Sequence, residues 1–135
     1  MTPPFLDTNV FLRHLLQDEP GQSPRATAYL ARIERGEIQA QISDLVIFEL
    51  VFTLQRTYRR SKETIRDVLL PFLDLPGILL PGKRRFRRVF DLYIDRNISF
   101  ADAYHVELME RLKLNEVVSF DRDFDRVVGL WRVEP

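Results

Sequence analysis

The pattern of hydrophobic and polar positions along the chain predicts short strands separated by longer amphipathic helices. The clearest alternation is in EIQAQIS, where Ile38, Ala40 and Ile42 share one side and polar residues share the other. Other strands are expected where short apolar runs end at polar or turn-forming residues. The expected strands are at residues 5–6, 38–42, 78–80, 116–120 and 130–133.

Apolar residues spaced by three and four positions predict the helices, and capping residues mark where they begin. The spacing from Phe86 to Tyr93, for example, predicts an amphipathic helix over residues 83–95. Helices are also expected after Asn9 as a cap, from Ser23, from Ser43, from Ser61 with a kink or end at Pro71, from Ser99, and near Phe124. Strands alternating with helices favour a single domain over residues 1–135. The expected architecture is a three-layer α/β/α fold with a central, mainly parallel sheet of about five strands.

Composition narrows the class of protein without indicating an activity. Twenty basic and twenty acidic side chains cancel, so net charge gives no argument for a nucleic-acid partner. A local basic patch remains, because KRRFRR places Arg84, Arg87 and Arg88 on the polar face of the helix at 83–95. The absence of cysteine excludes disulfides and thiolate catalysis. We expect a cytoplasmic protein without a signal peptide or a membrane span.

Two aspartates directly follow expected strands. Asp7 closes the strand in FLDTNVF, and Asp121 closes the strand in VVSFDRD. Each also fits an ordinary role as the N-cap of the next helix, although Asn9 can cap the first of these helices instead. Because ligands bind at the carboxyl ends of strands in open parallel sheets, a functional role is the alternative for both aspartates.

Two further acids belong to expected helices. Glu49 has Leu45, Val46 and Phe52 as helical neighbours, so its carboxylate is expected to be buried and to need a cation, an arginine, a proton or a route to water. Asp102 completes the pattern S-x-x-D with Ser99, which is the signature of a capping box. That position also directs its side chain out of the helix N-terminus.

In a parallel sheet the four acids are expected to meet at one edge, since strands end and helices begin there. Unpaired carboxylates repel one another, and a divalent cation would stabilise them together. An all-oxygen ligand set favours Mg²⁺, with Mn²⁺ as a second possibility. Asp123 and Asp125 are extra acids beside Asp121. A calcium loop is excluded, because Arg126 stands where such a loop requires glycine.

The segments FLDTNVF, ISDLVIFELVFTL, ISFADAYHVELMERL and VVSFDRDFDRV resemble, in order and spacing, the four acidic motifs of PIN-domain ribonucleases. The resemblance covers essentially the whole chain and is closest to the small VapC-like toxins of bacterial toxin–antitoxin pairs. It implies that the catalytic and metal-binding residues are Asp7, Glu49, Asp102 and Asp121. It also matches Asn9 and Ser119 to polar positions of the first and fourth motifs.

The resemblance implies a metal-dependent endoribonuclease that leaves 5′-phosphate and 3′-hydroxyl ends, with a small antitoxin partner and a homodimeric state. The helix at 83–95 is then a candidate surface for the RNA backbone. Two other functions stay open. One is a phosphatase that forms an aspartyl-phosphate at Asp7, weakened because Asn9 replaces the usual acid–base aspartate. The other is a non-catalytic binding module with a PIN-like fold.

Overall fold

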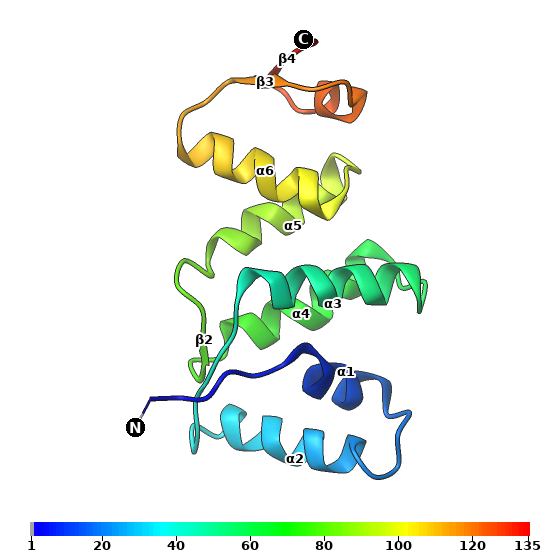
Figure 1. Ribbon diagram of the computed structural model, residues 1–135, viewed down its shortest axis with the longest axis vertical. Helices are drawn as coiled ribbons and strands as arrows, with labels where there is room; N and C mark the ends of the chain where they lie inside the picture. Colours follow the sequence, from blue (N-terminus) through cyan, green and yellow to red (C-terminus); the bar gives the residue numbers. More distant parts are fainter. Residues whose placement is uncertain (1) are drawn as a thin grey trace. The chain divides into compact units, whose positions relative to one another are not determined.

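A computed structural model describes residues 2–135, which form two compact parts. We refer to Met1–Lys83 as the N-terminal part and to Arg84–Pro135 as the C-terminal part. Both consist of helices joined to short strands, coloured along the sequence in Figure 1. No helix in the described range combines the length and apolar character needed to cross a membrane.

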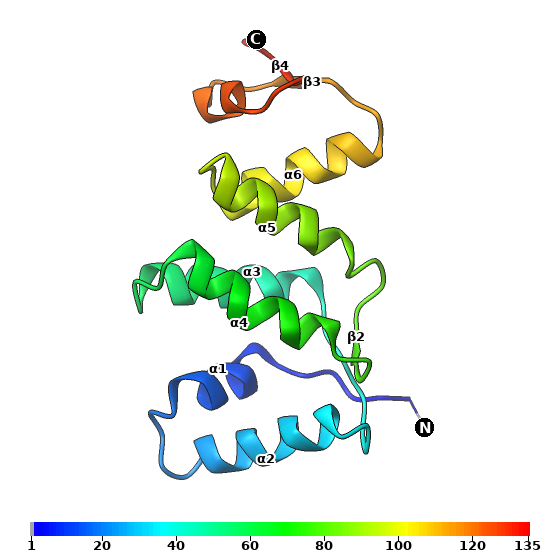
Figure 2. The same cartoon turned by 180° about the vertical axis from the view of Figure 1, so that it is seen from behind.

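The N-terminal part contains four helices and two short strands among its described residues. These are α1 (Thr8–Leu16), α2 (Ser23–Glu34), β1 (Ala40–Gln41), α3 (Asp44–Arg56), α4 (Lys62–Asp74) and β2 (Ile78–Leu79). Strands β1 and β2 are parallel, and Phe5 adds a parallel bridge to Gln41. Helix α1 lies beside α2, and α3 lies beside α4, in both views of the molecule (Figures 1 and 2).

The core of the N-terminal part is built from apolar faces of its helices. Ile47 and Leu50 of α3 are fully buried, as are Ile65 and Leu69 of α4. Pro71 was expected to kink or end α4, but the helix continues to Asp74. One lost backbone hydrogen bond near a helix end is offset here by burial of the residues that follow the proline.

The C-terminal part pairs two helices through a cluster of aromatic rings. Its elements are α5 (Arg85–Asp95), α6 (Phe100–Arg111), β3 (Glu116–Val118), the 3₁₀ helix η1 (Arg122–Arg126) and β4 (Trp131–Val133). The Phe100 ring of α6 lies 5.0 Å from Phe90 and 5.3 Å from Tyr93 of α5, measured between ring centroids. These aromatic contacts explain why the spacing from Phe86 to Tyr93 produces a helix with one fully buried face.

The α/β class expected from the sequence is confirmed, but the single central sheet is not. Each of the five expected strands appears as a short strand or bridge, and all pairings among the described residues are parallel. They form one two-stranded sheet with a bridge in the N-terminal part and one two-stranded sheet, β3–β4, in the C-terminal part. Strands of two or three residues offer few backbone hydrogen bonds, so each sheet is small.

Candidate metal centre

Three aspartates of the C-terminal part form a carboxylate cluster. Asp102, Asp121 and Asp123 each place one carboxylate oxygen within 4.8 Å of the oxygens of the other two. Asp102 lies in the first turn of α6, Asp121 precedes η1, and Asp123 lies within η1. We call these three residues the aspartate cluster. Its three oxygens are of the type that hard divalent cations prefer.

Local backbone bonds position the members of the aspartate cluster. Ser99 caps α6, and its Oγ accepts a hydrogen bond from the Asp102 backbone N–H at 3.0 Å. Asp121 caps η1 in the same way, because its carboxylate accepts the Asp123 N–H at 2.9 Å. Ser119 Oγ in turn accepts the Asp121 N–H at 2.9 Å. These bonds satisfy N–H groups that would otherwise lack partners, and they fix the backbone of all three residues and the carboxylate of Asp121.

The electrostatics of the cluster oppose the ionised form of Asp102. Partial burial is the largest cause that raises the pKa of this carboxyl group, and the neighbouring charge of Asp121 raises it further. The Ser99 hydroxyl and the nearby His105 act in the opposite direction. A bound divalent cation would favour both ionised carboxylates and remove their repulsion, so the residues present fit a metal site.

The third acid of the D-x-D-x-D run lies outside the aspartate cluster. Both oxygens of Asp125 face the guanidinium of Arg132, with Oδ1 at 3.0 Å from Nε and Oδ2 at 3.4 Å from Nη2. The Glu134 carboxylate, followed by that of Asp125, raises the pKa of Arg132. Asp125 therefore holds β4 to η1, while Asp123 belongs to the cluster. The capping bond explains why Asp123, and not Asp125, lies beside Asp121. The Asp121 carboxylate accepts the backbone N–H two residues later, which holds Asp121 and Asp123 close together.

Asp7 and its neighbours depart from the expected cap arrangement. Helix α1 starts at Thr8, so Asp7 is at the N-cap position and Asn9 lies inside the first turn. The expectation that Asn9 caps this helix is therefore wrong. The exposed Asp7 side chain makes no capping bond, and the buried Thr8 hydroxyl has no hydrogen-bond partner among the described residues. The start of α1 thus leaves a carboxylate free for another role.

Glu49 is exposed, which contradicts the expectation that it is buried. Of its three expected apolar neighbours, Val46 is buried, whereas Leu45 and Phe52 are 63% and 59% exposed. The other buried residues of α3 include Ile47 and Leu50. Because α3 is apolar on nearly all sides, the spacing of its residues did not show which face would turn towards the core.

The basic patch of α5 is exposed to solvent. Arg84, Arg87 and Arg88 are all exposed, and Arg88 forms an ion pair with Glu110 of α6, with 3.1 Å between Nε and Oε1. Arg85 instead places its guanidinium over the rings of Phe86 and Tyr104. The α5 surface therefore presents cations beside the helix that carries Asp102.

Comparison with known proteins shows similarity to PIN-domain proteins along both compact parts of the chain. The family model described as PIN domain matches residues 5–130. A VapC ribonuclease of Aquifex aeolicus (strain VF5) is 28% identical over 130 residues, which cover 96% of this chain and 95% of that protein. Asp7, Glu49 and the aspartate cluster all fall within the matched range. The order of acidic motifs, the carboxylate cluster and the extent of this match together show that the chain belongs to the PIN domain family.

Proposed function

We propose that this protein is a divalent-metal-dependent endoribonuclease that hydrolyses phosphodiester bonds in RNA. The observation that carries the proposal is the aspartate cluster in a chain of the PIN domain family. The similar protein of Aquifex aeolicus is named as a ribonuclease, which supports RNA as the substrate.

The cation is held by Asp102 and Asp121, with Asp123 as a third source of oxygen. Mg²⁺ is the expected ion and Mn²⁺ a substitute, because the side-chain ligands are all carboxylates. When bound, such a cation supplies a water nucleophile at neutral pH and neutralises charge on the scissile phosphate. Ser99 and Ser119 contribute by fixing the two aspartates through backbone caps, so little reorganisation accompanies cation binding.

Asp7 and Glu49 complete the set of acids in the proposed reaction. The support is the order of the four motifs and the family match over residues 5–130. Both carboxylates are exposed, and neither has a hydrogen bond or ion pair with another residue in the range 2–135. No structural task within the N-terminal part therefore accounts for them. We therefore assign both to the reaction, in the roles that the resemblance of the four acidic motifs implies.

Arg84 and Arg87 are assigned to the RNA backbone. Cations on one helix face bind phosphates without reading the base sequence. Arg88 contributes less than Arg84, because Glu110 already engages its guanidinium. This patch would add affinity and a dependence on salt, and it would leave the choice of RNA to other surfaces.

The biological setting we propose is that of a toxin in a type II toxin–antitoxin pair. The name of the Aquifex relative and its 28% identity over nearly the whole chain support this setting. A small antitoxin protein, a homodimeric state and a cytoplasmic location belong to the same proposal. Purification with the product of the adjacent gene is the direct test, with an antitoxin expected to bind tightly and suppress RNA cleavage.

The nuclease assignment is tested by incubating the protein with structured RNAs in Mg²⁺ or Mn²⁺, beside tubes with EDTA. Wild-type protein should cleave only with the cation and should leave 5′-phosphate ends. Asp7→Asn should keep the melting temperature and lose cleavage. Equal cleavage in every tube, including EDTA and Asp7→Asn, would reveal a contaminant and remove the assignment.

Glu49→Ala separates the nuclease from a binding module. If Glu49 serves the reaction, its replacement abolishes cleavage and leaves folding intact, as expected for an exposed side chain. If the acids serve only structure, stability changes and no RNA is cleaved by the wild type. A phosphatase of the aspartyl-phosphate class would instead give phosphorylated Asp7 with a phosphate-donor substrate, detected by mass spectrometry.

A further inference from the structure

Beside Asp7 lies a hollow whose lining includes residues outside the four acidic motifs. It has a volume of about 610 Å³ and is lined entirely by residues of the N-terminal part. Its polar lining comes from Asp7, Asn9, Arg13, Gln22, Arg25 and Tyr29. The apolar lining comes from Phe5, Leu6, Val10 and Ala26. We call this space the Asp7 hollow.

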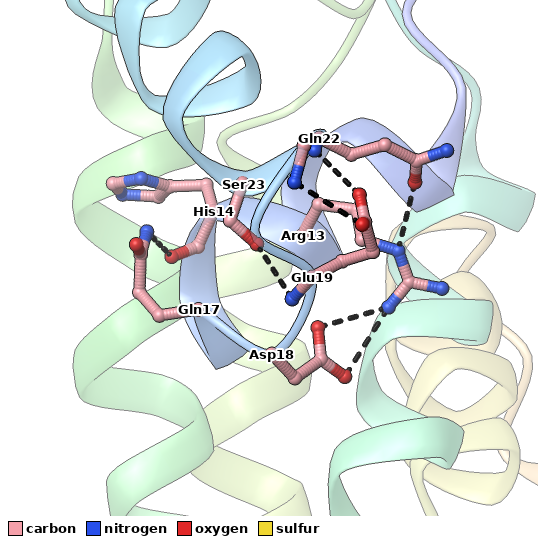
Figure 3. A network of polar contacts seen from close by, with 8 residues as sticks. Arg13, His14, Gln17, Asp18, Glu19, Gln22 and Ser23 are labelled. Carbon is pink, nitrogen blue, oxygen red and sulfur yellow. Dashed lines mark hydrogen bonds and ion pairs between the residues drawn. The ribbon is translucent and has the colours of Figure 1, made fainter.

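The α1–α2 connection holds one wall of the Asp7 hollow in place. Arg13 Nη1 lies 3.0 Å and 3.3 Å from the two oxygens of Asp18, and Arg13 Nε donates to Gln22 Oε1 at 3.2 Å (Figure 3). Glu19 accepts backbone N–H groups of Gly21 and Gln22, so its charge is used within the loop. The wall is therefore organised by residues of the chain itself, and the Arg13 charge is balanced by Asp18.

Arg25 and Tyr29 lie one turn apart on α2. Unlike Arg13, neither uses its side-chain charge or ring in a contact with another described residue. Arg25 is exposed, and its guanidinium has no ion pair or hydrogen bond with another residue in the range 2–135. Tyr29 is partly buried and makes no ring contact within the same range. Residues at i and i+4 share a helix face, and both Arg25 and Tyr29 line the Asp7 hollow.

We propose that the Asp7 hollow is a subsite for one unpaired nucleotide of the RNA substrate, with Tyr29 stacking on the base and Arg25 binding a flanking phosphate. An unstacked base placed on an aromatic ring, beside a cation for the backbone, is the usual mode of single-strand recognition. The amide of Asn9, which is exposed and has no partner among the described residues, is available for a base edge. This inference rests on the proposed ribonuclease function and goes beyond it by assigning residues that select unpaired RNA.

An RNA nucleotide fits this lining better than an acidic peptide does. A peptide carboxylate would be satisfied by Arg25 alone and would leave the half-buried ring and the free amide unused. The volume also exceeds what a free phosphate needs, and the apolar wall suits the flat face of a base. A nucleotide uses the cation, the ring and the amide together.

The test measures binding of a fluorescent eight-nucleotide single-stranded RNA by anisotropy, in an Asp121→Asn background that does not cleave it. Tyr29→Leu should weaken binding about fivefold or more, with an unchanged dependence on salt. Arg25→Gln should reduce the slope of log affinity against log salt by about 0.7, the value for one phosphate contact on a single strand. Arg32→Gln is the matched control, since Arg32 is exposed on the same helix, contacts Glu37 and does not line the hollow.

Two further comparisons keep the result interpretable. Tyr29→Phe retains the ring and should bind within twofold of the parent, which separates stacking from a loss of folding. The same RNA sequence closed into a hairpin stem should bind more weakly and should be insensitive to Tyr29→Leu, because its bases are already stacked.

The proposal is overturned if Tyr29→Leu leaves affinity unchanged or if Arg25→Gln and Arg32→Gln have the same salt dependence. Binding of a fluorescent polyglutamate peptide that depends on Arg25, with RNA binding unaffected, would assign the hollow to an acidic protein segment and would also overturn it. Cleavage of RNA by the wild type is measured in parallel. Normal cleavage with no effect of Tyr29→Leu or Arg25→Gln removes only the subsite. Absent cleavage with both binding effects present removes the nuclease and keeps the subsite.

Discussion

In the N-terminal part, Asp7 and Glu49 are exposed and have no partners among the described residues, whereas in the C-terminal part three aspartates hold their oxygens within 4.8 Å of one another. The N-terminal part has its buried core in the helix faces. The C-terminal part places Asp102 where burial and Asp121 both raise its pKa. The aspartate cluster therefore carries an electrostatic cost that a cation would relieve.

This difference shows how local hydrogen bonds can assemble three aspartates into a candidate metal site. One capping bond at the start of η1 brings Asp121 and Asp123 together. Asp102 lies in the first turn of α6, which Ser99 caps separately. Each bond is an ordinary local interaction. The cluster forms because two capped helices begin at the same place and bring their first-turn acids together.

The largest expected effect separates Asp121 from Asp125, two acids of the same turn. Asp121→Asn should lower the cation-dependent rate of RNA cleavage by about a hundredfold or more, because a proposed ligand is lost. Asp125→Asn should leave that rate within a few-fold, since Asp125 contacts Arg132 instead. Rates measured over a Mg²⁺ titration check both variants. Equal losses would mean that the aspartate cluster has no special role.

Two matched helix caps give the next effect in size. Ser99→Ala and Ser61→Ala each remove a hydroxyl that accepts an N–H, at 3.0 Å in α6 and 3.1 Å in α4. Each should cost about 1 kcal/mol of stability in denaturant unfolding. Only Ser99→Ala should also raise the Mg²⁺ concentration needed for half-maximal cleavage, because Ser99 holds Asp102. If Ser61→Ala raises it equally, the change reflects general loosening of the fold.

Asp102→Asn should stabilise the protein when no cation is bound. Because the pKa of Asp102 is raised in the folded state, that state holds more protons than the unfolded chain between the ordinary pKa and the raised one. The free energy of unfolding that depends on Asp102 is therefore highest at low pH, and it falls as the pH rises from the ordinary pKa through the raised one. The gain from Asp102→Asn at pH 7 should be below about 1 kcal/mol, because solvent screens a partly exposed group.

Unfolding in EDTA from pH 4 to pH 8 measures this effect, with Asp91→Asn on the exposed face of α5 as the control. The Asp102→Asn curve should diverge upwards from the wild type with rising pH, and the Asp91→Asn curve should not. Parallel curves for wild type and Asp102→Asn would show that the cluster stores no repulsion.

The smallest effect concerns the arginines of α5. Arg84→Gln should lower the slope of log RNA affinity against log salt by about 0.7, as expected for one lost phosphate contact. Arg88→Gln should change it less, because Glu110 already pairs with Arg88. Binding measured from low to moderate salt gives both slopes. A steeper loss from Arg88→Gln would contradict the assignment of Arg84.

The sequence predicts most of the elements because its local signals are strong. The caps at Ser43, Ser61 and Ser99 all begin helices, and the aromatic spacing in α5 produces a buried face. The meeting of Asp102 and Asp121 was expected from the carboxyl-edge argument. The sequence indicates Asp123 only as an extra acid beside Asp121, because residue spacing does not show that a 3₁₀ turn will follow the strand.

Other features depend on three-dimensional context that residue spacing does not contain. The exposure of Glu49 follows from which face of an apolar helix meets the core. The Asp7 hollow arises between α1 and α2 and includes Arg25 and Tyr29, which belong to no motif. The expected single sheet of about five strands is not confirmed, since each strand has only two or three paired residues.

The central claim is that the aspartate cluster binds a divalent cation required for RNA hydrolysis. The most direct measurement follows cleavage of one labelled RNA by wild-type protein before EDTA, in EDTA, and after Mg²⁺ is returned in excess, with Asp121→Asn in the same series. Cleavage by the wild type should stop in EDTA and recover with Mg²⁺, and Asp121→Asn should stay inactive throughout while melting like the folded protein. Cleavage that persists in EDTA, or in folded Asp121→Asn at the wild-type rate, would contradict the claim.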